Sequence, residues 1–179
     1  MRALCAGMLR VKNEARWIAE VLVSIQPVCH QIFVMDDHST DNTVKICESF
    51  GPQVIVLPSP FNKLDESADK NWLYDQILAR PEYAADSAGF NWPRWLLCID
   101  GDEVLDSRDT GLLTSFMDNS PDEIVAAKLR IVYLWNDRNT QRVDGGYARF
   151  ARPSLFRVFN PSFRFQSTPW GNGANFHCS

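Results

Sequence analysis

The chain has 179 residues, of which 45% are hydrophobic and 22% are charged. These values are ordinary for a soluble globular protein, and the length predicts one domain that can bury a real core. The formal net charge of −4 argues against non-specific binding to nucleic acid, because a polyanion requires a basic surface.

The five cysteines are widely spaced, and none of them forms a Cys-x-x-Cys pair. The pattern therefore predicts neither a zinc site nor a disulfide framework, and small buried thiols suit a reducing compartment. Arg10 interrupts the opening apolar run too early for a signal peptide, and no segment approaches membrane-spanning length. We expect a cytoplasmic protein without a membrane span.

In chain order, residues 3–9 form a first apolar run and are expected to be a strand. A loop follows, in which Asn13 is placed to cap a helix. That helix carries one apolar stripe and ends at Pro27. The stripe consists of Ile18, Val21, Leu22 and Ile25.

Residues 31–35 are the next expected strand, and it runs into a polar turn that begins with Asp36. Ser39 or Thr40 can cap the helix that follows, which Gly-Pro closes. Residues 54–57 are a third strand. This β-α-β-α-β order predicts a parallel sheet with right-handed crossovers.

A helix is expected over residues 64–79, with Trp72, Leu73 and Ile77 as core contacts, and residues 81–93 read as a surface excursion. Residues 95–99 are uninterrupted apolar residues, which is typical of a strand buried on both faces.

An acidic turn, Asp100-Gly101-Asp102-Glu103, follows that strand directly. Open α/β sheets place their ligands at the carboxyl ends of strands. Gly101 permits a tight turn and removes a side chain that would crowd the site. Asp100 and Asp102 can converge on one hard cation, because Mg²⁺ and Mn²⁺ prefer oxygen ligands.

Beyond the turn we expect a helix over 111–117, a long strand over 124–135 and another strand over 154–159. Residues 166–179 are rich in Gly and Asn. From residue 145 onward the chain has no acid but four arginines, which suit either an anionic ligand or stacking on aromatic faces. These are Arg149, Arg152, Arg157 and Arg164.

Three stretches, "MLRVKNEARWIAEVLVSI", "IFVMDDHSTDNT" and "WLLCIDGDEVL", resemble the landmarks of family-2 glycosyltransferases of the GT-A fold. "DESADKNWLYDQIL" is similar to the family's helix before the last landmark, and "RVDGGYARFARPSLFRVF" resembles a later stretch of some members. The resemblance implies a Rossmann-like, mostly parallel sheet flanked by helices, with a small antiparallel C-terminal part. It also implies one catalytic domain over 1–179, with a nucleotide-binding half at 1–104 and an acceptor-side half at 105–179 that is short for the family.

The implied activity is inverting transfer of a sugar from a nucleotide-sugar donor, expected to be UDP-linked, to an acceptor hydroxyl of unknown identity. Asp36 and Asp37 are placed to accept hydrogen bonds from the base and ribose. Asp100 would face the ribose or a Mn²⁺ or Mg²⁺ ion, and Asp102 would bind that ion and neutralise the departing diphosphate. Lys12 and Asn13 border the same crevice.

Inversion requires a general base for the acceptor hydroxyl. After Glu123 only Asp137 and Asp144 are acids, so the base is one of these or lies outside this chain. Asp144, beside two glycines, is preferred. The family also implies a C-terminal histidine near the metal, which here is His177. Cys178 stands where the family often has Glu, so an acid role is not expected at that position.

Three other classes compete with this reading. A non-catalytic sugar-nucleotide-binding module would keep the acidic turn without a base. "CIDGDEV" also matches the Asp-x-Asp-x-Val turn of haloacid-dehalogenase-type phosphatases, although that family places the turn near its N-terminus. GT-A-like nucleotidyltransferases need a Gly-rich loop after the first strand, and "LRVKNEAR" has no glycine.

Overall fold

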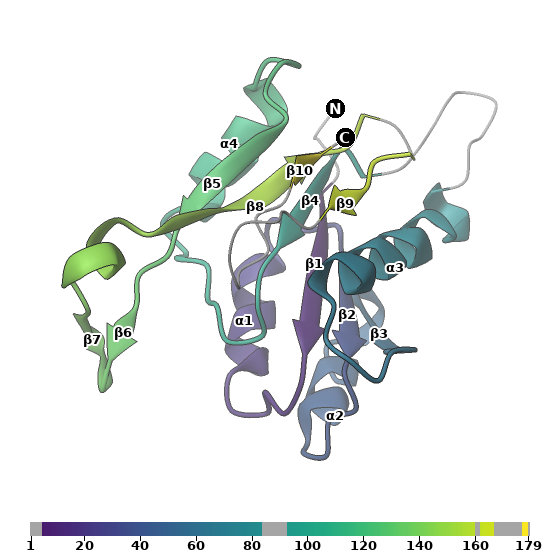
Figure 1. The fold of residues 1–179 in the computed structure, drawn as a ribbon, viewed down its shortest axis with the longest axis horizontal. Coiled ribbons are helices and arrows are strands. Elements are labelled where there is room, and N and C mark those ends of the chain that lie inside the picture. Colours follow the sequence, from purple (N-terminus) through teal and green to yellow (C-terminus); the bar gives the residue numbers. More distant parts are fainter. Residues whose placement is uncertain (1–4, 84–92, 160–161, 167–176, 179) are drawn as a thin grey trace.

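The computed structural model describes residues 5–83, 93–159, 162–166 and 177–178. Its centre is a six-stranded sheet with the order β3-β2-β1-β4-β8-β5 (Figure 1). The six strands are β1 (Cys5–Val11), β2 (Gln31–Asp36), β3 (Val54–Pro58), β4 (Trp95–Cys98), β5 (Ala126–Arg130) and β8 (Ala151–Arg157).

The first four strands are mutually parallel, whereas β8 runs antiparallel to both β4 and β5. The predicted mostly parallel α/β sheet is therefore confirmed. From β1 the chain moves outward to β2 and β3, and it then returns to β4 on the other side of β1. This reversal makes the edge between β1 and β4 a topological switch point, where open α/β sheets bind ligands.

Helices cover both faces of the sheet (Figure 1). They are α1 (Ile18–Ile25), α2 (Thr43–Glu48), α3 (Glu66–Leu78) and α4 (Thr110–Asn119), with short 3-10 turns η1 (Gly51–Gln53), η2 (Pro81–Tyr83) and η3 (Gly145–Arg149). Side chains of α1, α2 and α4 join one core cluster, and those of α3 join the other. Among the described residues, no helix combines the length and apolar character needed to cross a bilayer.

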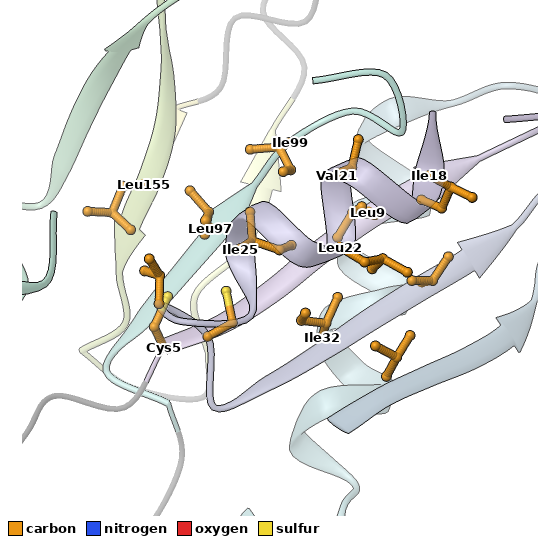
Figure 2. Packing of buried hydrophobic residues seen from close by; sticks show 14 of the residues in the cluster. Cys5, Leu9, Ile18, Val21, Leu22, Ile25, Ile32, Leu97, Ile99 and Leu155 are labelled. Atoms are coloured by element: carbon orange, nitrogen blue, oxygen red, sulfur yellow. The ribbon is translucent and has the colours of Figure 1, made fainter. Parts of the chain in front are cut away.

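The core follows the period-two alternation of the strands. In β4, Trp95 and Leu97 face the α1 side, whereas Leu96 and Cys98 face α3. Figure 2 shows the α1 side chains meeting those of β1, β2 and β4. All four residues of the predicted α1 stripe are fully buried, and every residue from 95 to 99 is buried, which confirms both predictions.

The cysteines behave as small hydrophobes, as expected. Four of them are buried free thiols in the described part of the chain, namely Cys5, Cys29, Cys47 and Cys98. Burial raises the pKa of the Cys98 thiol to about 12, so this thiol is not a nucleophile at neutral pH.

The two predicted helix caps are wrong. Helix α1 begins after Trp17 and α2 after Asn42, and neither start has a side-chain cap. The Asn13 side chain instead accepts the Thr40 N–H from the loop after β2, and the Ser39 hydroxyl accepts the Asn13 N–H from the loop after β1. Polar side chains of this kind accept from whichever backbone donors lie nearest.

The expected long strand over 124–135 is also wrong. Strand β5 ends at Arg130, after a register shift between Ala127 and Lys128. The chain then leaves the sheet as β6 (Leu134–Trp135), which pairs with β7 (Asp137–Gln141). Asn136, at φ 63°, reverses the chain between them. A last pair, β9 (Phe165–Gln166) and β10 (His177–Cys178), is antiparallel.

Arg157 fixes the connection between α4 and β5 to the main sheet. Its guanidinium donates to the carbonyls of Ser120, Pro121 and Ile124 at 2.8 to 3.0 Å. It also lies over the Trp95 ring, 4.4 Å from the centroid. Stacking, one of the two alternatives for the C-terminal arginines, therefore holds for Arg157.

The turn after β4 packs directly against the end of β1. A Cβ atom on Gly101 would lie 2.9 Å from both the Val11 Cγ1 and the Glu14 Cγ atoms. Gly101 is not among the residues with positive φ. The position therefore requires glycine for space, and a left-handed backbone is not the reason.

We predict that Gly101→Ala lowers the free energy of unfolding by about 1–3 kcal/mol, because the buried Val11 side chain must move. The matched control is Gly111→Ala in α4, where nothing lies within 4 Å of an added Cβ atom. That change is expected to be neutral or stabilising by up to about 1 kcal/mol. Urea denaturation measures both variants, and equal stability of the two would contradict the packing argument.

Candidate active site

A cavity of about 280 Å³ opens at the carboxyl ends of β1 and β4. Its walls come from the end of β1, the acidic turn after β4, the first half of α3 and the start of β8. The charged side chains that line it are Arg10, Lys12, Glu14, Glu66, Asp69, Lys70, Asp100, Asp102 and Arg152. Carboxylates and cations are thus interleaved around one small space at the switch point.

A second hollow, of about 470 Å³, lies over α4 and Pro27. Asp118 is its one charged lining residue within the described chain. Its other lining residues are uncharged, whereas charged side chains cluster around the first cavity, so that cavity is the candidate active site.

The acidic turn is held from within by Glu103. The Asp100 backbone N–H donates to the Glu103 carboxylate at 3.0 Å, and the Glu103 N–H donates to the Asp100 carbonyl at 3.1 Å. Arg152 reaches this turn from β8 and pairs with both Asp100 and Glu103. In the described part of the chain the Asp102 carboxylate makes no hydrogen bond or ion pair. Both predicted carboxylates, Asp100 and Asp102, line the cavity.

Glu14 is a third carboxylate at this place. Burial, followed by the negative charges of Asp102, Asp41 and Asp100, raises the pKa of the Glu14 carboxyl above its ordinary value. A cluster of negative charge that disfavours its own ionisation is an environment that favours a bound cation. Glu14 lies in the stretch "MLRVKNEARWIAEVLVSI", but no local pattern in that stretch predicts a role for it. Its contact with Gly101 appears only once β1 and β4 are adjacent.

Asp37 is the centre of an ion-pair network. Its Oδ2 atom lies 2.7 Å from the Arg10 guanidinium and 3.4 Å from the Lys12 ammonium. Arg10 also lies 2.8 Å from Asp69 of α3, although the geometry of that contact is not that of a hydrogen bond. Burial raises the pKa of the Asp69 carboxyl. The network ties α3 to the ends of β1 and β2.

Asp36 is 8% exposed, and one oxygen of its carboxylate is buried without a partner in the described part of the chain. Its Oδ2 atom accepts the Ser39 N–H at 3.1 Å, whereas its buried Oδ1 atom has no partner among the described residues. A buried unsatisfied acceptor is costly, so a donor from a ligand would be favoured there.

The loops after β1 and β2 are clamped together by side chains. Asn13, at φ 58°, accepts the Thr40 N–H at 2.7 Å, and its own N–H donates to the Ser39 hydroxyl at 2.9 Å. Asp41 accepts the N–H groups of both Ala15 and Thr43. In this structure the Asn13 side chain therefore joins the two loops.

The two predicted base candidates lie elsewhere. Asp137 accepts the N–H groups of Asn139 and Thr140, and Asp144 pairs with Arg142 at 2.7 Å. Both belong to the segment around β6 and β7, which projects beyond the outer end of the sheet in Figure 1, and neither lines the cavity. The side chain of His177 and residues 167–176 lie outside the described part of the chain, so its predicted contact with the metal stays a prediction.

Comparison with known proteins identifies the family. Residues 9–171 match the family model described as Glycosyl transferase family 2. An uncharacterized glycosyltransferase of Rickettsia felis is 28% identical over 171 residues, which cover 95% of this chain and 50% of that protein. One from Rickettsia conorii is 26% identical over the same shares of both chains. This chain thus spans about half the length of the curated relatives that it matches.

Solved structures show the same fold. Residues 1–349 of S. aureus TarS, crystallised in complex with UDP-GlcNAc, have a TM-score of 0.52 and 20% identity, with 75% of this chain and 36% of that chain covered. The sheet order, the two covered faces and this likeness agree on a GT-A fold. Because the family model matches most of its length, the chain belongs to glycosyl transferase family 2.

Proposed function

We propose that this chain transfers a sugar from a UDP-linked donor to an acceptor hydroxyl with inversion, aided by a divalent cation at the acidic turn. The observation that carries the proposal is the cavity in which carboxylates and basic side chains meet at the switch point of the sheet. A nucleotide sugar needs both kinds of group, because its base and ribose present hydrogen-bond donors and its diphosphate is an anion. The UDP-GlcNAc complex of TarS, a protein of the same fold, supports a UDP-linked donor.

The residues present are compatible with one hard cation. In the described part of the chain no three His, Cys, Asp or Glu side chains gather as a complete ligand set. Mg²⁺ and Mn²⁺ commonly take one or two carboxylates and complete their coordination with substrate phosphates and water. Asp102 and Asp100 supply that number of carboxylates, and among the described residues Asp102 has no hydrogen-bond or ion-pair partner that would compete with the ion. When bound, such an ion neutralises charge on the departing diphosphate.

The chain's own residues would orient the donor around that point. We assign the Asp36 carboxylate, whose buried Oδ1 atom lacks a partner among the described residues, to an N–H donor of the base, and Asp37 to the nucleoside beside it. Lys70 of α3 and Arg152 of β8 line the cavity and offer positive charge to the diphosphate. Burial lowers the pKa of the Lys70 ammonium, so this charge is partly desolvated and attracts an anion more strongly than a surface lysine does.

Inversion forms a bond from the acceptor oxygen to the anomeric carbon as the bond to the diphosphate breaks, and the acceptor proton passes to a base. Asp144 acts as that base only if its segment closes toward the cavity, because it now pairs with Arg142 at the outer end of the sheet. The base is therefore a prediction that rests on the sequence alone.

The second candidate is a binding module that holds a sugar nucleotide without transferring it. The position of Asp137 and Asp144 away from the cavity favours this alternative. The two candidates differ in one measurement, since a transferase releases UDP from UDP-sugar in the presence of acceptor and a binding module does not. Membership of glycosyl transferase family 2 rules out the phosphatase alternative.

We predict that Asp102→Asn weakens Mn²⁺-dependent binding of UDP by more than about tenfold, or roughly 1.4 kcal/mol, because the side chain keeps its size but loses its charge. Isothermal titration calorimetry measures the affinity. The matched control is Asp109→Asn, an exposed residue at the start of α4, which should leave the affinity unchanged. Unaltered binding by the Asp102 variant would remove this residue from the site.

A separate prediction concerns the nucleoside. Asp37→Ala is expected to weaken uridine binding several-fold in the presence of a chelator, because it removes an acceptor and releases Arg10 and Lys12. Saturation-transfer NMR with uridine reports this directly. If only the affinity for UDP with Mn²⁺ changes, Asp37 does not contact the nucleoside.

A further inference from the structure

Arg152 places a positive charge at the acidic turn. It is the second residue of β8 (Ala151–Arg157). Because β8 runs antiparallel to β4, this position lies beside the residues that follow β4. One terminal nitrogen of its guanidinium lies 3.1 Å from the Asp100 carboxylate and also contacts the Glu103 carboxylate. The carboxylate proposed to receive a divalent ion is therefore already paired with an arginine.

The two acidic partners of Arg152 differ in exposure. The Glu103 side chain is 22% exposed and accepts the Asp100 N–H, so it is fixed by the turn. The Asp100 side chain is 58% exposed. Ion pairs that are exposed to water contribute little free energy and exchange easily, whereas shielded and hydrogen-bonded pairs are held. Glu103 is thus the permanent partner of Arg152, and Asp100 is the exchangeable one.

The Arg152 guanidinium has more N–H donors than the two carboxylates use. Arginine carries five N–H donors, yet the buried Nε atom of Arg152 has no acceptor among the described residues. Arg152 also lines the cavity, where a planar guanidinium suits two phosphate oxygens better than a lysine does. An anion in the cavity would satisfy a donor that the present arrangement leaves unused.

We propose that Arg152 is a positioning residue that competes with the divalent cation for Asp100 and is transferred to the diphosphate when nucleotide binds. The inference rests on the proposed function for its diphosphate step, but the competition for Asp100 stands on the ion pairs alone. With no nucleotide, Arg152 lowers the affinity of the turn for the cation. A bound diphosphate attracts Arg152 and frees Asp100, so nucleotide and cation strengthen each other's binding. Coupling of this kind is reciprocal.

The test measures Mn²⁺ alone, and then UDP with Mn²⁺, by calorimetry on the full chain. In Arg152→Gln we expect Mn²⁺ alone to bind several-fold more tightly, and UDP with Mn²⁺ to bind about tenfold more weakly. Glu103→Gln keeps an acceptor for the Asp100 N–H but removes one negative charge from beside Arg152. Arg152 then pairs more strongly with Asp100, so Mn²⁺ alone should bind more weakly. Arg149→Gln removes the same charge from an exposed position three residues earlier and should change neither affinity.

Opposite changes in the two affinities are the signature of the proposal, because a merely unfolded or distorted site would lose both. The double variant Arg152→Gln/Glu103→Gln leaves no unpaired buried charge, and it should still bind Mn²⁺ more tightly than wild type. Unchanged or weaker Mn²⁺ binding in both Arg152 variants would overturn the competition. If the wild type binds Mn²⁺ but not UDP, the proposed function fails while the Mn²⁺ measurements still decide the role of Arg152.

Discussion

The arrangement of this site depends on the concentration of negative charge where the buried strand β4 ends. Asp100, Asp102 and Glu14 line one cavity at this edge of the sheet, and burial together with the negative charges of the aspartates raises the pKa of the Glu14 carboxyl. Gly101 allows this approach, since any side chain there would collide with Val11 and Glu14. Like charges that share a site favour the binding of a compensating cation. Arg152 supplies one from β8, and the proposed divalent ion would supply another.

The surrounding loops hold that edge in place. Asn13 and Asp41 tie the loop after β1 to the loop after β2, and Arg10 ties both strands to α3 through Asp37 and Asp69. Three segments far apart in the sequence are thereby fixed relative to one another before any ligand arrives. Preorganised polar groups of this kind stabilise charge at little reorganisation cost, which suits a site that must accept a charged donor.

Much of the fold was predictable because its signals are local. The stripe at Ile18, Val21, Leu22 and Ile25 and the uninterrupted run before Asp100 each follow from side-chain periodicity and burial. The prediction that Asn13 and Ser39 cap helices is wrong, because the same hydrogen-bonding groups can serve either a helix cap or a neighbouring loop. The pairing of Arg152 with the acidic turn depends on two antiparallel strands whose contact no local pattern encodes.

The central claim, that the acidic turn binds a cation together with a nucleoside diphosphate, is tested most directly by crystals grown with Mn²⁺ and UDP. Diffraction data collected at the manganese absorption edge locate the ion without reference to the rest of the map. Our account predicts one anomalous peak that is coordinated by the Asp102 carboxylate and by oxygens of both phosphates, with Asp100 beside it. A peak coordinated by other side chains, or UDP bound away from the cavity at the ends of β1 and β4, would contradict it.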